Sequence, residues 1–231
     1  MRISTQRGRS ETVTAEAYED AGAEKPKLRG IPHVLGAVIA IPAAMWLYAQ
    51  ANSGIPKICA IVYGTGIFSM LALSATYHTP MWSLEARARW RLVDHAMIFI
   101  QVGVSYTPIC LLSLPHELGY PLLAVAWAMS LLGFFWTILS GGTHRRIRTA
   151  MYWICGWIIL PVLPRVYDGM DRFSFQWLLF GGVIFCLGSL IYVTKKPNLV
   201  PGVFGYHELF HCFVVAGFAC HFTMVWHLVT L

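Results

Sequence analysis

The chain has 231 residues, of which 57% are hydrophobic, 14% aromatic and only 12% charged. A typical soluble domain carries about 25% charged residues, so this composition excludes an ordinary soluble protein, and a chain this apolar would not stay disordered. Eleven of the 28 charged residues fall within residues 1–29, so the rest of the chain has the composition of a protein embedded in a bilayer.

Seven apolar runs follow this polar segment. A helix needs about 20 mainly apolar residues to cross roughly 30 Å of hydrocarbon. In chain order, runs of this kind lie at 32–51, 57–78, 92–113, 121–140, 150–167, 174–193 and 207–229. The sequence therefore predicts an all-α membrane fold: a seven-transmembrane helical bundle over residues 30–231 of a multi-pass cell-membrane protein, preceded by a polar, flexible tail over residues 1–29.

The basic residues predict how the bundle is oriented. Cytoplasmic loops of membrane proteins carry an excess of Lys and Arg. With seven spans, 14 of the 17 basic residues fall on the side of the N-terminal tail, and the other side receives only Lys57, Arg165 and Arg172. The N-terminus is therefore expected in the cytoplasm and the C-terminus outside. Because the basic residues form no stripe interleaved with aromatic residues, we expect no nucleic-acid partner.

Ionisable residues gather at one level of this predicted bundle. The second span runs inward and ends at His78, the third begins near Asp94, and the seventh begins at His207, with His211 one turn deeper. Ionisable groups at membrane depth are costly, so those that persist are candidates for function. Three separate helices are thus expected to bring such groups together at the cytoplasmic face.

The spacing of these residues indicates a metal site. Ser74 and His78 are four residues apart, as are His207 and His211, so each pair lies on one face of its helix. Two imidazoles from one helix and a third from another supply the three nitrogen ligands of a catalytic zinc site with an open position. Asp94 would orient a water molecule there or accept its proton. The alternative is an interhelical hydrogen-bond network without metal, and the convergence of three helices favours zinc.

Residues 207–211 also fit the His-Glu-x-x-His pattern of zinc metalloproteases. In that interpretation His207 and His211 are still metal ligands, and Glu208 is the general base. Glu208 lies about 100° around the helix from His207 and is expected to face the cytosol. The interpretation that uses Asp94 is therefore favoured over the protease.

The remaining histidines are given simpler roles. Ten residues, or about 15 Å of helix, separate His221 from His211, so His221 is expected to be a hydrogen-bonded histidine of the bundle interior. His95 lies on another face from Asp94 and is expected to be a hydrogen-bonding neighbour. Histidines at span ends or in loops are expected to be solvated; these are His33, His116 and His144.

Several ordered motifs carry a resemblance to a known family. They are Ser74-x-x-x-His78, Asp94-His95, the run Gly103-Val-Ser-Tyr-Thr-Pro108, His207-Glu-Leu-Phe-His211 and Cys220-His221-Phe222. Together they resemble the hemolysin III family, the bacterial branch of the progestin and adipoQ receptor group, over essentially the whole chain after the tail. The resemblance implies that His78, His207 and His211 bind zinc and that Asp94 and Ser74 lie beside it. It also implies seven spans with the N-terminus inside.

The resemblance implies more than one activity, and three hypotheses follow. The first is a zinc-dependent membrane hydrolase of lipid-like amides or esters, because relatives in the wider superfamily resemble alkaline ceramidases. The second is a membrane receptor or regulator in which zinc is structural. The third is a cytolytic, pore-forming protein, but a pore would need a polar stripe along several helices, whereas the polar residues here are concentrated at one end.

Overall fold

The computed structural model describes residues 25–141 and 145–231 and confirms an all-α fold. Seven helical segments are long and apolar enough to cross a membrane. Six are continuous, and the fifth is made of three shorter pieces. The helices are α2 (Ile31–Gln50), α3 (Ile55–His78), α4 (Leu84–Leu112), α5 (His116–Leu139), α6 (Arg145–Trp157), η1 (Leu160–Val162), α7 (Leu163–Gly169), α8 (Arg172–Thr194) and α9 (Tyr206–Thr230).

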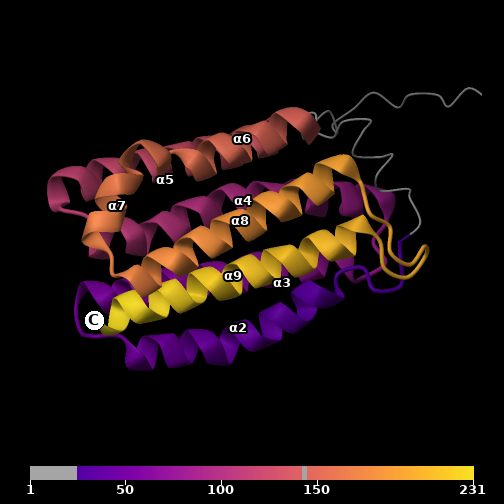
Figure 1. Ribbon diagram of the computed structural model, residues 1–231. Helices are drawn as coiled ribbons and strands as arrows, with labels where there is room; N and C mark the ends of the chain where they lie inside the picture. The colour runs from indigo at the N-terminus through magenta and orange to yellow at the C-terminus, as the bar shows by residue number, and fades with distance from the viewer. Residues whose placement is uncertain (1–24, 142–144) are drawn as a thin grey trace, which may run out of the picture.

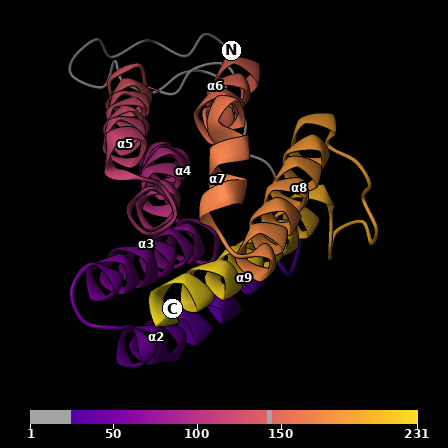
Figure 2. The same ribbon diagram turned by 60° about the vertical axis from the view of Figure 1, so that its left-hand side comes forward.

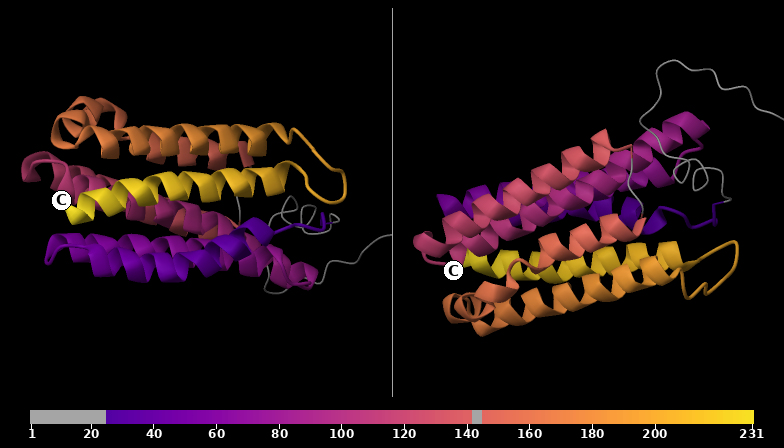
Figure 3. Two further views of the ribbon diagram at one scale, coloured as in Figure 1. Left: turned by 60° about the horizontal axis from the view of Figure 1, so that its bottom comes forward. Right: turned by 90° about the horizontal axis from the view of Figure 1, so that it is seen from above.

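The helices lie side by side along one axis, as Figure 1 shows, and α7 crosses one end of the bundle. Helix α9 is central: it packs most extensively on α8 and also contacts α2, α3 and α4. The view in Figure 2 shows α6 and α7 standing between the α4–α5 pair and α8. The start of α2 and the C-terminus lie at opposite ends of the bundle (Figure 3), as an odd number of crossings requires.

The outer surface of the bundle is apolar. Large hydrophobic side chains on α2, α5 and α8 are exposed, among them Met45, Leu132 and Val183. A soluble protein rarely exposes so large a contiguous apolar surface, whereas a bilayer provides an apolar environment for it. Most of the buried residues in the described chain lie on α3, α4 and α9. The apolar surface and the helix lengths both indicate a multi-pass membrane protein.

Helix α4 begins earlier than the apolar run predicts, at Leu84 instead of residue 92. The hydroxyl of Ser83 caps the helix by accepting a hydrogen bond from the Ala86 amide at 3.3 Å. One turn on, Arg89 pairs with Glu85 across four residues at 2.5 Å. A cap and a pair of this spacing both stabilise a helix, so they extend α4 beyond its apolar part.

The fifth span is interrupted, although the sequence predicts one run over residues 150–167. Proline cannot donate a backbone hydrogen bond and favours the first turn of a helix, so Pro161 and Pro164 end the regular α6 and begin η1 and α7. The Tyr106 hydroxyl forms hydrogen bonds with two backbone groups at the break. It donates to the Gly156 carbonyl at 2.8 Å and accepts from the Ile159 amide at 3.0 Å. The break is therefore anchored to α4.

Candidate metal centre

Three histidines converge where α3 ends and α9 begins. His78 is the last residue of α3, and His207 and His211 lie on the first two turns of α9. One ligand atom from each ring lies within 4.8 Å of the other two. The ring centroids are 4.9 Å apart for His78 and His207 and 4.6 Å apart for the other two pairs. The structure thus brings together the three residues that the helical spacing predicts as ligands.

Two nitrogens of this cluster are buried without a hydrogen bond. Among the described residues, neither Nε2 of His78 nor Nδ1 of His211 has a partner. Leaving a buried polar atom unpaired costs about 1–3 kcal/mol, so such atoms call for an explanation. Three imidazole nitrogens are the ligand set of one class of catalytic zinc sites. The donor set therefore fits a zinc ion.

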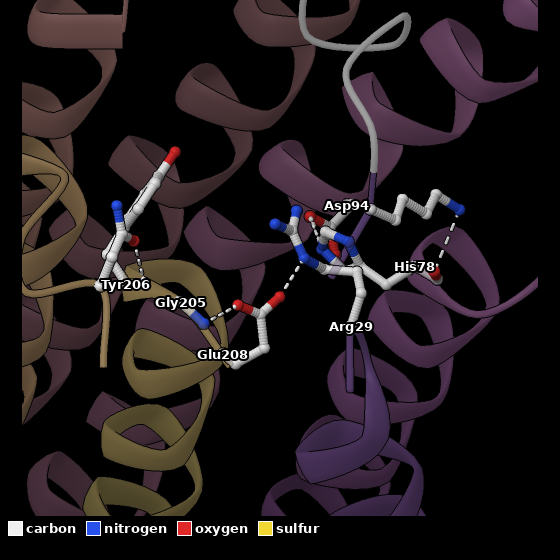
Figure 4. Close-up of polar contacts among 8 residues, drawn as sticks. Arg29, His78, Asp94, Gly205, Tyr206 and Glu208 are labelled. Atoms are coloured by element: carbon white, nitrogen blue, oxygen red, sulfur yellow. Dashed lines mark hydrogen bonds and ion pairs between the residues drawn. The ribbon is translucent and has the colours of Figure 1, made fainter. Parts of the chain in front are cut away.

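The other two predicted site residues lie beside the cluster. Asp94 projects from α4 toward His78 (Figure 4). Its Oδ2 is 3.9 Å from Nε2 of His78. Ser74, one turn before His78, lies near the Asp94 carboxylate. Both side chains are buried, and within the described chain Oδ1 of Asp94 has no partner. A carboxylate held in this way can accept a proton from a group placed next to the histidines.

The cluster opens into an elongated interior cavity of about 270 Å³. Along α4 the lining runs from Asp94 to Ile109, which is about 22 Å at 1.5 Å per residue. At the histidine end the lining is polar, with Ser74, Asp94, His95, His207 and His211. Deeper in the bundle it becomes mainly apolar, with Ile109, Ile159, Leu178, Val214 and Phe218. The shape and polarity fit a ligand with a polar head and a long apolar tail.

Glu208 does not face the cytosol, which corrects the expectation from the helical wheel. Its side chain is fully buried. The Arg29 Nε donates to Oε1, and the Gly205 amide donates to Oε2 at 2.7 Å (Figure 4). Glu208 therefore caps the start of α9 and holds Arg29, and it is not one of the residues that converge on the candidate ligand set.

The segment that carries Arg29 packs against the same end of the bundle. Residues 1–24 of the predicted tail lie outside the described residues, but Lys25 donates from Nζ to the His78 carbonyl at 3.1 Å. Partial burial, followed by repulsion from Arg87 and Arg29, lowers the pKa of Lys25. Gly30 has φ 84°, and a Cβ there would lie 2.9 Å from Cβ of His78. Only glycine allows this close approach at a positive φ.

Comparison with known families identifies the chain. The family described as haemolysin-III related matches residues 21–222, a range that contains the whole cluster. The chain belongs to the hemolysin III family. This confirms the resemblance seen in the sequence, and with seven candidate spans it makes the chain a multi-pass protein of the cell membrane.

Proteins similar to this chain come from bacteria and animals. The chain is 27% identical over 198 residues to hemolysin-3 of Bacillus cereus, covering 84% of this chain and 87% of that protein. It is 26% identical over 198 residues to the hemolysin-3 homolog of Bacillus subtilis (strain 168), covering 84% and 90%. It is 25% identical over 212 residues to the human monocyte to macrophage differentiation factor, covering 84% and 80%.

In this hemolysin III family protein, a fourth histidine that sequence analysis assigned to solvent lies beside the cluster. His33, near the start of α2, is only 1% exposed. Its ring stacks on that of His211, with centroids 3.8 Å apart and planes 11° apart. The first and seventh spans begin at the same end of the bundle, and this is the signal in the sequence that could have placed His33 beside the cluster. By contrast His116 is exposed, as expected, and His144 lies outside the described residues.

Two further histidines line the cavity of this hemolysin III family protein. Nε2 of His221 lies 3.2 Å from the Leu178 carbonyl, as expected for a histidine of the bundle interior. The backbone carbonyl of His95 accepts a hydrogen bond from the Tyr152 hydroxyl at 2.7 Å, which ties α4 to α6. Both rings contribute to the cavity wall, His95 at its polar end and His221 at its apolar end.

Proposed function

We propose that the chain is a zinc-dependent hydrolase of lipid-like amides or esters. The observation that carries this proposal is the position of the histidine cluster and Asp94 at the polar end of a long, mainly apolar cavity. An acylated substrate could place its tail among the apolar residues and its carbonyl next to the histidines. The orientation predicted from the basic residues would put this reaction near the cytoplasmic face.

The chain supplies both the metal ligands and a proton acceptor in this proposal. His78, His207 and His211 hold zinc, which when bound lowers the pKa of a water molecule to about 7 and polarises a carbonyl group. Asp94 accepts the proton as a general base. Ser74 lies near this carboxylate and would help to hold it in place.

The geometry of Glu208 favours this assignment over a metalloprotease. A protease of the His-Glu-x-x-His type needs the glutamate as its general base. Here both carboxylate oxygens of Glu208 are engaged, one by Arg29 and one by the Gly205 amide. Asp94, with an oxygen that has no hydrogen-bond partner in the described part of the chain, is the carboxylate available for proton transfer.

The proposal is tested by Asp94→Asn in protein purified in detergent. Asparagine keeps the shape of aspartate but cannot accept a proton, so hydrolysis of a panel of fatty-acyl amides and esters should fall about 10²–10⁴-fold. Zinc content, measured by elemental analysis, should be unchanged. The matched control is Asp168→Asn, because Asp168 is exposed on α7, away from the cavity; it should retain full activity.

Other outcomes would replace the proposal. A wild-type protein that holds zinc but hydrolyses no member of the panel would favour a receptor with structural zinc. Release of a trapped dye from vesicles by the wild-type protein, again without hydrolysis, would favour the pore-forming hypothesis. Loss of peptide hydrolysis in Glu208→Gln, while Asp94→Asn stays active, would favour the metalloprotease hypothesis.

A further inference from the structure

His33 is buried at the candidate metal centre without a hydrogen-bond partner. Its side chain is 1% exposed, and neither Nδ1 nor Nε2 is hydrogen-bonded to any other described residue. A neutral imidazole always carries one N–H donor and one acceptor nitrogen, whichever tautomer is present. Burying both without partners is unfavourable, so the ring needs a partner that is not among the described residues. His33 lines the cavity, where such a partner could lie.

The stacking geometry argues against His33 as a fourth metal ligand. An imidazole binds a metal through a lone pair that lies in the plane of its ring. The planes of His33 and His211 are 11° from parallel and their centroids are 3.8 Å apart. An ion in the plane of the His211 ring would therefore lie well outside the plane of His33. Consistent with this, the group of mutually close ligand atoms contains His78, His207 and His211 but not His33.

The same stacking fixes His33 in one orientation. The ring lies against the face of His211, and its helix approaches α3 and α9 closely at Gly36, where a Cβ would lie 3.2 Å from Leu71 and 3.3 Å from Val215. A donor held rigidly needs no reorganisation when a ligand arrives. His33 is thus a preorganised N–H group directly beside the ligating histidines.

We propose that His33 donates a hydrogen bond to a carbonyl or carboxylate oxygen of the ligand that occupies the cavity beside the three histidines. This rests on the proposed metal-dependent function. Negative charge gathers on that oxygen when an acyl group is attacked, and it is already present on the carboxylate product. A fixed donor in a buried site stabilises such charge more than water would. His33 donates a hydrogen bond to the ligand oxygen, whereas Asp94 accepts a proton.

The test uses the full chain, purified in detergent and loaded with Co²⁺, and acetate as the probe. Acetate binding is followed by the change in the visible absorption of Co²⁺. His33→Phe keeps an aromatic ring for the stack but removes both nitrogens. A hydrogen bond to a charged group is worth about one to two powers of ten in affinity, so acetate should bind about 10–100-fold more weakly. The Co²⁺ stoichiometry should not change.

Two further variants isolate the donor. His33→Gln restores an N–H group of similar reach and should recover part of the lost affinity, and it serves as the main variant if His33→Phe does not fold. The matched control is His116→Phe, because His116 also stacks on a neighbouring ring, that of Tyr120, with centroids 4.8 Å apart, but is exposed and far from the cavity. The control should bind acetate as the wild type does.

Each remaining outcome overturns the proposal. Equal acetate affinity in wild type, His33→Phe and His33→Gln would mean that His33 only packs against His211. Loss of Co²⁺ from His33→Phe would make His33 a ligand. Both results would leave the proposed metal centre in place. A wild-type protein that binds neither Zn²⁺ nor Co²⁺ would overturn the metal centre itself, and this proposal with it.

Discussion

The two ends of the bundle contain the same residue types in different states. At one end, Ser74 and Asp94 lie beside the histidine cluster, and several buried nitrogen and oxygen atoms have no partner among the residues that the structure describes. At the other end, Asp171, Ser174 and His227 satisfy one another. Nδ1 of His227 lies 3.0 Å from the Ser174 hydroxyl and 3.1 Å from Oδ2 of Asp171, whose Oδ1 accepts from the Ser174 amide at 3.0 Å.

This difference separates a structural set of polar residues from a candidate reactive one. Ser174 and Asp171 both contact the same nitrogen of His227, whereas a catalytic triad needs the serine and the carboxylate on opposite nitrogens of the ring. The set instead caps α8 and links it to the end of α9. Residue types alone therefore do not indicate chemistry. Buried polar atoms that have no partner and face a cavity are the better indication of a reactive site.

The largest expected effect concerns which compartment each end faces. A reporter that is active only outside the cytoplasm should be fully active when fused after Leu231, and a cytosol-only reporter should be inactive there, because 14 of the 17 basic residues are predicted on the opposite side. The reverse activities would place the histidine cluster outside the cell and would overturn the predicted orientation.

Removing one histidine from each end should give opposite results for metal. His207→Ala should lose most of the bound zinc, from about one ion per chain in the wild type, because two imidazoles hold zinc much more weakly than three. Its melting temperature should also become insensitive to a chelator, since metal binding contributes to folding free energy. His227→Ala should retain its zinc. Equal zinc in both variants, by elemental analysis, would contradict the ligand set.

Breaking the Arg29–Glu208 pair should destabilise the end of the bundle that carries the histidine cluster, and the zinc content should not change. Glu208→Gln leaves the Arg29 charge without its partner in a partly buried position, which should cost about 1–3 kcal/mol of unfolding free energy. The control is Glu85→Gln, whose exposed pair with Arg89 should contribute at most about 0.5 kcal/mol. Thermal unfolding in detergent measures both. A silent Glu208→Gln would mean that the segment before α2 is held by its other contacts, such as the hydrogen bond from Nζ of Lys25 to the His78 carbonyl.

The smallest effect is expected from removing the charge of Asp171, at the opposite end of the bundle, and it concerns how stability depends on pH. Although partial burial opposes the shift, hydrogen bonds from Ser174 and attraction to His227 lower the pKa of Asp171 below its ordinary value of 3.8. A carboxyl whose folded-state pKa is lowered stabilises the protein above its unfolded-state pKa, and this stabilisation is lost as the pH falls through the folded-state pKa.

Asp171→Asn tests this, because asparagine still caps a helix but carries no charge. Near neutral pH the variant should be less stable than the wild type by less than about 1 kcal/mol, the usual limit for an ion pair that water still reaches. The difference should shrink as the pH is lowered below 3.8, toward the lower pKa of the folded state. Melting temperatures of the two proteins across this range measure it, and a difference independent of pH would rule out the ion pair.

The sequence by itself determined the helices and the level of each ionisable residue along them. Hydrophobic length predicts the seven spans, because each must cross the same apolar thickness. The four-residue spacing of Ser74 with His78 and of His207 with His211 predicts which side chains share a helix face. Both properties depend on neighbours within one helix, so they can be read from a short stretch of chain.

Only the tertiary structure decided which helices pack together and which faces meet. Arg29 and Glu208 are 179 positions apart, so no local pattern could show that Glu208 is buried beneath the segment before α2. His33 resembles a solvated residue at a helix end until α2 packs on α9 and stacks it on His211. Such contacts depend on how helices turn toward one another around their axes. Hydrophobicity in a uniformly apolar span leaves that angle undetermined, and packing fixes it.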